Sequence, residues 1–535
     1  MPKPISMKRR DFLRHTLPAS VTMPALLNGF SVKAYTGSSP LVQALMRGTT
    51  ETDKVLVLIQ LNGGNDGLNM VLPIELYSNY YNARANIAIK QNKILALSGT
   101  AKTGLHPSMT GLQSLYNEGK LTIIQAVGYP SPNFSHFRAT DIWMSASDSN
   151  QVLPSGWIGR YLGTQFPDYP NGYPNTQMPD PLAIQIGSVS SLTLQGPASG
   201  MGISISDPTN FYHMLDGVED PVPDTPWGKE LKYIRLIAEQ TQKYSTVIKA
   251  AAAQVGSQGT YPENNDLAQQ LKIVARLVKG GLKTRVYMVS TGGFDTHSSQ
   301  VNTLDSSTGL HANLMARVSD AIKCFMDDLK SLGVDDRVIG MTFSEFGRRI
   351  KSNSSMGTDH GAAAPVFVFG KNVRPGIIGN NPEIPSNTAA NDNVPFQYDF
   401  RSIYASILKQ WFCVQDADLQ TIMLKNFQEL PLCINAACKT TGIEDILNNT
   451  GEQLIINYPN PFVESTNITF RTKGGHTLIQ VMDTMGRVIR TLTDKEYMAG
   501  SYTVSFSSYG MPTGVYYARF QNGSLQHVRT MLKVR

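Results

Sequence analysis

The chain has 535 residues, of which 41% are hydrophobic and 16% charged, a composition typical of a globular protein with one large domain and an additional module. The net charge of +6 comes from the two ends, because residues 1–34 hold six basic and one acidic side chain and residues 452–535 hold nine and five. Residues 35–451 therefore carry −3, which argues against nucleic acid as a partner. We predict no transmembrane segment, because no apolar run reaches the ~18 residues that a membrane span needs.

Residues 1–34 have the layout of an export signal. A basic start is followed by a moderately apolar stretch, Thr16 to Phe30, and then by small residues around Ala34. The pair Arg9-Arg10, followed by Asp-Phe-Leu, resembles a twin-arginine signal. We therefore predict a twin-arginine-type export signal over residues 1–34, with the twin-arginine export machinery as a partner. An ordinary basic helix is the alternative.

Residues 35–445 alternate between strand-like and helix-like patterns, which predicts an α/β domain with a mostly parallel sheet flanked by helices. Continuous apolar runs, typical of strands buried on both faces, occupy residues 55–61, 121–128, 284–290, 337–343 and 364–370. Helical periodicity covers residues 266–279, with Asp266 as the expected cap, and residues 310–332 and 400–412. Residues 145–230 are rich in Pro, Gly, Ser and Asp and are interpreted as long loops or a cap beside the sheet.

Polar side chains stand at the ends of these strands. Parallel sheets bind ligands outside the carboxyl ends of their strands, so these residues are candidates for a shared site. They are Asn62, Asn65 and Asp66 after the first run; Ser135, His136 and Arg138 after the second; Asp295 and His297 after the third; Glu345 and Arg348 after the fourth; and Asp359 and His360 just before the fifth.

Asp295 and His297 are the clearest pair of candidate metal ligands. Their spacing of two residues turns both side chains the same way in an extended segment. Carboxylate oxygen and imidazole nitrogen both bind zinc, manganese and similar metals. We therefore predict that these two residues hold one cation.

Other kinds of site are disfavoured by the motifs. The glycine-rich loop at Asn62 lacks GxGxxG and lacks GKS or GKT, which argues against dinucleotide and P-loop binding, and it could be a simple tight turn. Ser135 and His136 are neighbours whose side chains would point apart in a strand, so a Ser–His dyad is disfavoured. There is no GxSxG elbow. The four cysteines form no CxxC pair, although Cys433 and Cys438 could pair in an oxidising compartment.

Residues 452–535 follow a different sequence pattern from the centre of the chain. Short alternating strands separated by turns predict a small antiparallel β-sandwich. The opening YPNPF, the later MPTGVYYARF and the basic end resemble the C-terminal sorting domain of the type IX secretion system of Bacteroidetes. This resemblance implies type IX secretion machinery as a partner and export through the periplasm to the cell surface or extracellular space. The alternative is a generic carbohydrate-binding or adhesive sandwich.

The ordered motifs NGGND, SHFRATDIW, GGFDTH, FSEFGR and TDHG, across roughly residues 50–420, resemble a large exported bacterial family of unknown function. That family is usually grouped with the alkaline phosphatase and sulfatase superfamily. The resemblance implies an alkaline-phosphatase-like fold that holds one or two divalent metals, with Zn, Mn and Ca as the candidates. It also implies a Ser, Thr or modified Cys nucleophile.

By position, the resemblance implies a role for each candidate residue. Asp66 or Asn62 would be the first metal ligand, and Ser135 would stand at the nucleophile. The remaining implied metal ligands are Asp295, His297, Glu345, Asp359 and His360. Two departures weaken the second metal and the sulfatase assignment: Phe346 stands where a second histidine is expected, and there is no Cys-x-Pro-x-Arg.

These features predict a secreted or cell-surface metal-dependent hydrolase of phosphate or sulfate esters, acting on a small molecule or a glycan. Arg138 and Arg348 would neutralise charge on the reacting group, and His136 would protonate the leaving group. The rival prediction is a non-catalytic surface protein that keeps the fold and binds a glycan or another partner. A metal-independent serine hydrolase is a third alternative.

Overall fold

The structure is a computed structural model that describes residues 26–27, 30–31, 53–207 except 168 and 189, 243–434, and 455–534 except 459, 473, 499 and 524. The chain divides into two compact units, one of residues 51–438 and one of residues 1–50 together with 439–535. Within residues 1–34 the described elements are the short strands β1 (Leu26–Leu27) and β2 (Phe30–Ser31). The twin-arginine motif itself lies outside the described residues.

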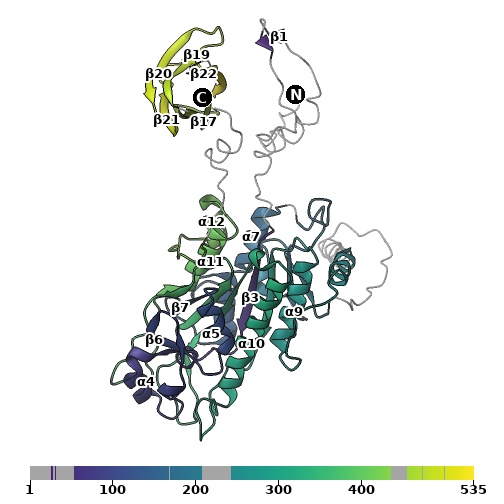
Figure 1. Ribbon diagram of the computed structural model, residues 1–535, viewed down its shortest axis with the longest axis vertical. Coiled ribbons are helices and arrows are strands. Elements are labelled where there is room, and N and C mark those ends of the chain that lie inside the picture. The colour runs from purple at the N-terminus through teal and green to yellow at the C-terminus, as the bar shows by residue number, and fades with distance from the viewer. Residues whose placement is uncertain are drawn as a thin grey trace. The chain divides into compact units, whose positions relative to one another are not determined.

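A mixed sheet forms the centre of the larger unit (Figure 1). Among the described residues its strand order is β15-β7-β14-β11-β3-β10-β8-β9, with β16 paired to β7. All neighbours run parallel except β14, which is antiparallel to both β7 and β11. The strands are β3 (Val55–Leu61), β7 (Leu121–Gly128), β8 (Ala183–Ile186), β9 (Ile203–Ile205), β10 (Val286–Thr291), β11 (Val338–Phe343), β14 (Ala364–Gly370), β15 (Gly376–Ile378) and β16 (Tyr398–Asp399). The predicted α/β class with a mostly parallel sheet is confirmed.

Helices cover both faces of this sheet, which explains why every residue of β3 is buried. Val55, Val57 and Ile59 pack on one side with α5 (Thr110–Asn117), α9 (Asp266–Lys279) and α10 (Leu310–Ser331). Leu56 and Leu58 pack on the other side with α6 (His136–Ser145), α7 (Trp157–Gln165), α11 (Phe400–Gln410) and α12 (Asp416–Met423). Alternate residues of one strand thus feed two hydrophobic cores, as a strand buried on both faces requires.

Smaller elements surround the edge of the sheet. They are α3 (Gly67–Met70), α4 (Tyr77–Ala83), the three-stranded sheet of β4 (Val71–Pro73), β6 (Thr100–Leu105) and β5 (Leu95–Leu97), and the pair β12 (Gly347–Arg348) and β13 (His360–Gly361). No described helix is long and apolar enough to cross a membrane.

Two sequence-based expectations for this unit need correction. Residues 145–230 are not only loops or a cap, because α7 packs on the sheet and β8 and β9 extend it. Residues 208–242 lie outside the described residues. The cap of α9 is Asn265 rather than Asp266, since the Asn265 side chain accepts a hydrogen bond from the Ala268 amide at 3.0 Å.

Residues 455–533 of the smaller unit form two antiparallel sheets, as the alternating pattern predicted. One is β17-β18-β21 and the other β20-β19-β22-β23. Their bounds are β17 (Ile455–Tyr458), β18 (Ser465–Thr472), β19 (Gly475–Met482), β20 (Val488–Tyr497), β21 (Gly500–Ser507), β22 (Gly514–Asn522) and β23 (Leu525–Lys533). The sequence pattern missed β20, whose residues are mostly exposed and polar.

The cysteines differ from the expected pairing. Cys433 is a buried free thiol, and burial raises its pKa to about 11. Cys324 is also free, whereas Cys413 is disulfide-bonded. The proposed Cys433–Cys438 bridge is therefore wrong. A disulfide in this chain fits an oxidising compartment.

Candidate metal centre

The strand directions bring the predicted polar segments to one edge of the sheet. β3, β7, β10 and β11 all run the same way, so the residues that follow them meet at their shared carboxyl edge. β14 runs in the opposite direction, so the residues that precede it reach that edge as well. This reversal is why Asp359 and His360, which come before a strand, join residues that come after strands.

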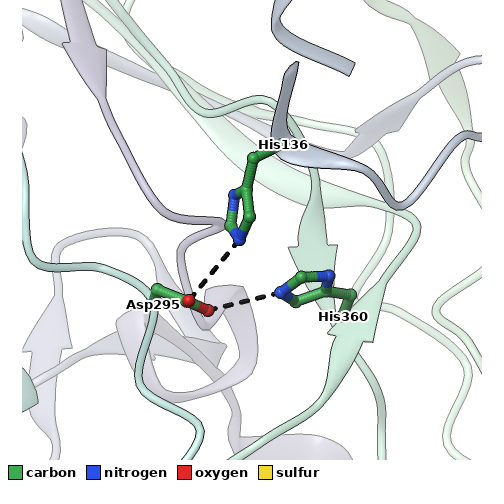
Figure 2. Close-up of side chains that lie close together, drawn as sticks. All are labelled: His136, Asp295 and His360. Atoms are coloured by element: carbon green, nitrogen blue, oxygen red, sulfur yellow. Dashed lines mark hydrogen bonds and ion pairs between the residues drawn. The ribbon is translucent and has the colours of Figure 1, made fainter. Parts of the chain in front are cut away.

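Three side chains from three of these segments point toward one another (Figure 2). They are His136 at the start of α6, Asp295 beyond β10 and His360 in β13, and one ligand atom from each lies within 4.8 Å of the others. His136 Nε2 is 3.5 Å from Asp295 Oδ2, and His360 Nε2 is 3.3 Å from Asp295 Oδ1. Carboxylate and imidazole groups in this arrangement can hold a metal ion.

His297 adds a fourth candidate ligand atom to this group. Its Nε2 is 3.1 Å from Asp295 Oδ1 and 2.9 Å from His360 Nε2. We call His136, Asp295, His297 and His360 the candidate metal centre. The separations given above, from 2.9 to 3.5 Å, are similar to the distance of about 3.3–3.4 Å between neighbouring ligand atoms of a metal whose bonds are about 2.0–2.1 Å.

Each histidine of the centre has an acceptor on its other ring nitrogen. His136 Nδ1 is 2.8 Å from Glu345 Oε1, His297 Nδ1 is 3.3 Å from Asp359 Oδ1, and His360 Nδ1 is 2.8 Å from the Phe134 carbonyl. A carbonyl or carboxylate oxygen can only accept, so each Nδ1 carries the hydrogen. A ring that carries its hydrogen on Nδ1 alone turns a bare Nε2 toward the centre, which is the tautomer that a metal-binding histidine needs.

The contact between His297 and His360 is favourable only when a positive charge lies between or beside the two rings. With Nδ1 protonated on both rings, two nitrogen lone pairs face each other at 2.9 Å, and the Asp295 carboxylate is beside both. All of these atoms are acceptors, so their approach is repulsive unless a proton or a metal cation lies among them. Burial lowers the pKa of His360, even though the Phe134 carbonyl favours its charged form.

Glu345 contacts the centre from the interior of the fold. Its side chain is buried, and Oε1 also accepts a hydrogen bond from the Gly63 amide at 2.8 Å. Gly63 has a φ of +126°, and a Cβ there would lie 2.3 Å from the Asp295 amide nitrogen. Only glycine allows the loop after β3 to come this close to the loop after β10. Glu345 therefore orients His136 as an outer partner of a metal ligand does.

Arg348 supports Asp295 from the interior of the fold. Its side chain is fully buried, and it donates to the carbonyls of Gly63, Gly64, Phe294 and Thr358 as well as to Asp295 Oδ1 at 2.7 Å. Burial opposes ionisation of Asp295, but the hydrogen bond from Arg348 and its charge prevail, so the pKa of Asp295 is lowered. Asp295 is thus held as a carboxylate.

Replacing Arg348 with methionine is expected to destabilise the larger unit by about 3 kcal/mol, because four loop carbonyls and Asp295 lose their buried donor. Urea unfolding followed by tryptophan fluorescence would measure this loss. The matched control is Arg349→Met at the adjacent, half-buried position, which we expect to cost less than about 1 kcal/mol. Equal losses of stability in the two variants would contradict this structural role of Arg348.

The structure places three other predicted residues outside the centre. Asp66 is buried in an ion pair with Arg84 at 2.8 Å and also accepts from Gln300. Ser135 stands exposed at the start of α6, and among the described residues its hydroxyl makes no hydrogen bond. The Arg138 guanidinium donates to the loop of residues 147–151 at the other end of that helix.

Phe137 and Asp141 lie beside the centre and were not singled out from the sequence. An open depression of about 540 Å³ is lined by His136, Phe137, Asp141 and Asp295, among others. Phe137 is 89% exposed. The signal was present in HFRATD, because residues four apart lie on one face of a helix. It was not recognised because His136 was expected in a strand, whereas the structure starts α6 there.

Comparison with known proteins agrees with the expected relationship. Residues 231–416 match a family described as a protein of unknown function, DUF1501, and residues 457–534 match a secretion system C-terminal sorting domain. The two matches bear out the suspected family of unknown function over residues 231–416 and the type IX sorting domain over residues 457–534. The sorting domain indicates export to the cell surface or the extracellular space. No curated protein matches the chain.

Solved structures show a distant likeness. An alkaline phosphatase superfamily protein from Vibrio parahaemolyticus is 12% identical, with 90% of this chain and 83% of that chain covered and a TM-score of 0.35. A sulfatase from Pseudoalteromonas sp. is 11% identical, with coverages of 87% and 85% and a TM-score of 0.31. Such scores say nothing about activity, so any inference about activity rests on the side chains of the centre.

Proposed function

We propose that this protein is an exported, metal-dependent hydrolase of phosphate or sulfate esters. The observation that carries the proposal is the convergence of three Nε2 atoms and the Asp295 carboxylate, with each Nδ1 held by an acceptor. The Arg9-Arg10 signal, entry into the periplasm and an origin in Bacteroidetes are parts of the same proposal.

The donor set fits a borderline divalent metal. Three imidazole nitrogens and one carboxylate suit Zn²⁺ or Mn²⁺, whereas Ca²⁺ prefers six to eight oxygen ligands. A bound cation of this kind would supply Lewis acidity and would activate water at neutral pH. We favour Zn²⁺ at the four-residue centre, and Asp66, with its own ion pair, would not be a ligand.

The protein's own residues would orient the reaction. Glu345 holds the His136 ring, and Arg348 fixes the Asp295 carboxylate, so the ligands are pre-positioned on rigid segments. Ser135 is next to His136 and exposed, which leaves its hydroxyl accessible as a nucleophile. Arg348 donates to loop carbonyls and Arg138 Nη2 donates to the loop after α6, so neither is proposed to contact the reacting ester.

The test is a panel of 4-nitrophenyl phosphate, methyl 4-nitrophenyl phosphate and 4-nitrophenyl sulfate, assayed with Zn²⁺ or Mn²⁺. We expect turnover of at least one ester that is lost with a chelator and restored by metal. Ser135→Ala is expected to lower kcat by at least about 100-fold, because it removes the proposed nucleophile. Turnover that ignores the chelator would contradict the proposal and favour a serine hydrolase.

A non-catalytic surface protein is the second candidate. The observation that favours it is that Arg348 donates to loop carbonyls and Asp295, and that Arg138 Nη2 donates to residues 147–151 at the far end of α6. Such a protein would bind metal at the centre without hydrolysing any ester in the panel. Metal binding with no turnover would therefore select this alternative.

A further inference from the structure

The open depression beside the candidate metal centre has an acidic rather than a basic lining. Asp141, Asp295 and Glu345 line it, and its lining contains no lysine or arginine. Asp141 lies within α6, four residues after Phe137, so both side chains belong to one face of the helix. Among the described residues the Asp141 carboxylate makes no ion pair, so its charge is free to act on a ligand.

The cationic side chains around the depression are turned to other partners. The side chain of Arg348 is fully buried under Asp295, and its donors are taken by loop carbonyls. Arg349 donates to the carbonyls of His360 and Ala390. A divalent ion among the Asp295 and Glu345 carboxylates and the Arg348 guanidinium therefore presents about one net positive charge to a ligand, and Asp141 opposes any second negative charge.

We propose that this depression selects ligands whose tetrahedral group carries a single negative charge, such as a sulfate monoester or a phosphate diester. Asp141 repels dianions such as phosphate monoesters. Phe137 contacts the organic part of the ligand. This inference rests on the proposed metal centre and names the substrate class for the same site.

Phe137 suits that role because of its exposure. Its side chain is 89% exposed at the first turn of α6, next to His136. An exposed aromatic ring offers a large apolar surface on which the organic part of a ligand can pack. Its ring lies at the rim of the depression, where a ligand that reaches the centre would pack against it.

The test is a binding comparison by calorimetry on the zinc-loaded protein at pH 8. The probes are phenylphosphonate, which is a dianion, and methyl phenylphosphonate, which is a monoanion with the same phenyl group. A bare cation prefers the dianion. We expect the protein to reverse this order and bind the monoanion more tightly. Equal binding of the two probes, or tighter binding of the dianion, would overturn the inference.

Variants separate the two contributions to binding. Because repulsion scales with ligand charge, Asp141→Asn should strengthen dianion binding by about tenfold and monoanion binding by about threefold. Phe137→Ala should weaken both probes by a similar factor. Asp418→Asn, at an exposed position of α12, is the matched charge control and should change neither. An unchanged affinity ratio in Asp141→Asn would also overturn the inference.

Gly292 offers a steric test that leaves the metal ligands intact. It lines the depression, and a Cβ there would meet no atom within 4 Å. Gly292→Leu should therefore fold and bind zinc normally while losing affinity for both probes. Retained probe binding would show that ligands bind elsewhere and would overturn the assignment of the depression.

Turnover then identifies which monoanion is used and separates this inference from the proposed hydrolase. Preference for 4-nitrophenyl sulfate or for methyl 4-nitrophenyl phosphate over 4-nitrophenyl phosphate supports charge selection and distinguishes the two sources. The expected order of probe binding without any turnover would retain the charge selection and reject the hydrolase. Preference for 4-nitrophenyl phosphate would reject the charge selection and retain the hydrolase.

Discussion

Replacing His360 with alanine is expected to lower the affinity of the protein for Zn²⁺ by at least about 100-fold. His360 Nε2 lies 3.3 Å from Asp295 Oδ1 and 2.9 Å from His297 Nε2, so it is central to the proposed ligand set. Loss of an outer partner of a metal ligand already costs roughly 10–100-fold in affinity, and loss of a ligand costs more. Competition with a chromophoric zinc chelator would measure the change.

Two further variants define the range of this effect. Glu345→Gln removes the carboxylate behind His136 but leaves all four ligand atoms, so we expect an intermediate loss of about 10–100-fold. His476→Ala removes an exposed histidine of β19 that pairs with Asp494 at 3.0 Å, and should leave affinity unchanged. Full zinc occupancy in His360→Ala and in Asp295→Ala would show that the centre is not the metal site.

Lowering the pH from 7 to 5 is expected to destabilise the larger unit by about 4 kcal/mol through two buried histidines. Burial lowers the pKa of His106 to about 3 and that of His311 to about 4. In the unfolded chain both titrate near 6.5, so below that pH the unfolded state binds more protons than the folded state. Stability is therefore complete above about pH 6.5 and falls as the pH drops toward 4, by about 2 kcal/mol for each histidine at pH 5.

Urea unfolding at both pH values would test this expectation. All four tryptophans lie in residues 51–438, so their fluorescence reports on the larger unit. His311→Gln should reduce the pH-dependent loss by about half, because one titrating group is removed. His476→Gln, an exposed change in the other unit, should leave the loss as it was. Equal losses in all three proteins would contradict the assignment of the effect to the buried pair.

Local sequence patterns predicted the strands well because burial on both faces leaves a strong signal. The run at residues 121–128 matches β7 in full, and the run at residues 55–61 matches β3. The pattern failed where strands are short or exposed. β8 and β9 are short strands within a loop-rich stretch, and β20 is largely solvent-exposed, so neither region gives a continuous apolar run.

The sequence alone pointed to the segments that meet at the candidate site, because carboxylates and imidazoles placed at strand ends stand out from an otherwise apolar sheet. It also identified the sorting domain, whose motifs are contiguous. It could not assign partners, because ligand geometry depends on contacts between residues more than 60 positions apart, such as His297 and His360 at 2.9 Å.

Tertiary structure decided the role of each residue. The reversed direction of β14 brought His360 to the centre, the helix start at His136 turned that ring toward Asp295, and burial committed Arg348 to loop carbonyls. Asp66 forms a buried ion pair with Arg84, which comes from another segment of the chain. The physical reason is that a charged or polar side chain takes the partner that folding brings within reach, and sequence spacing fixes that partner only within one helix or strand.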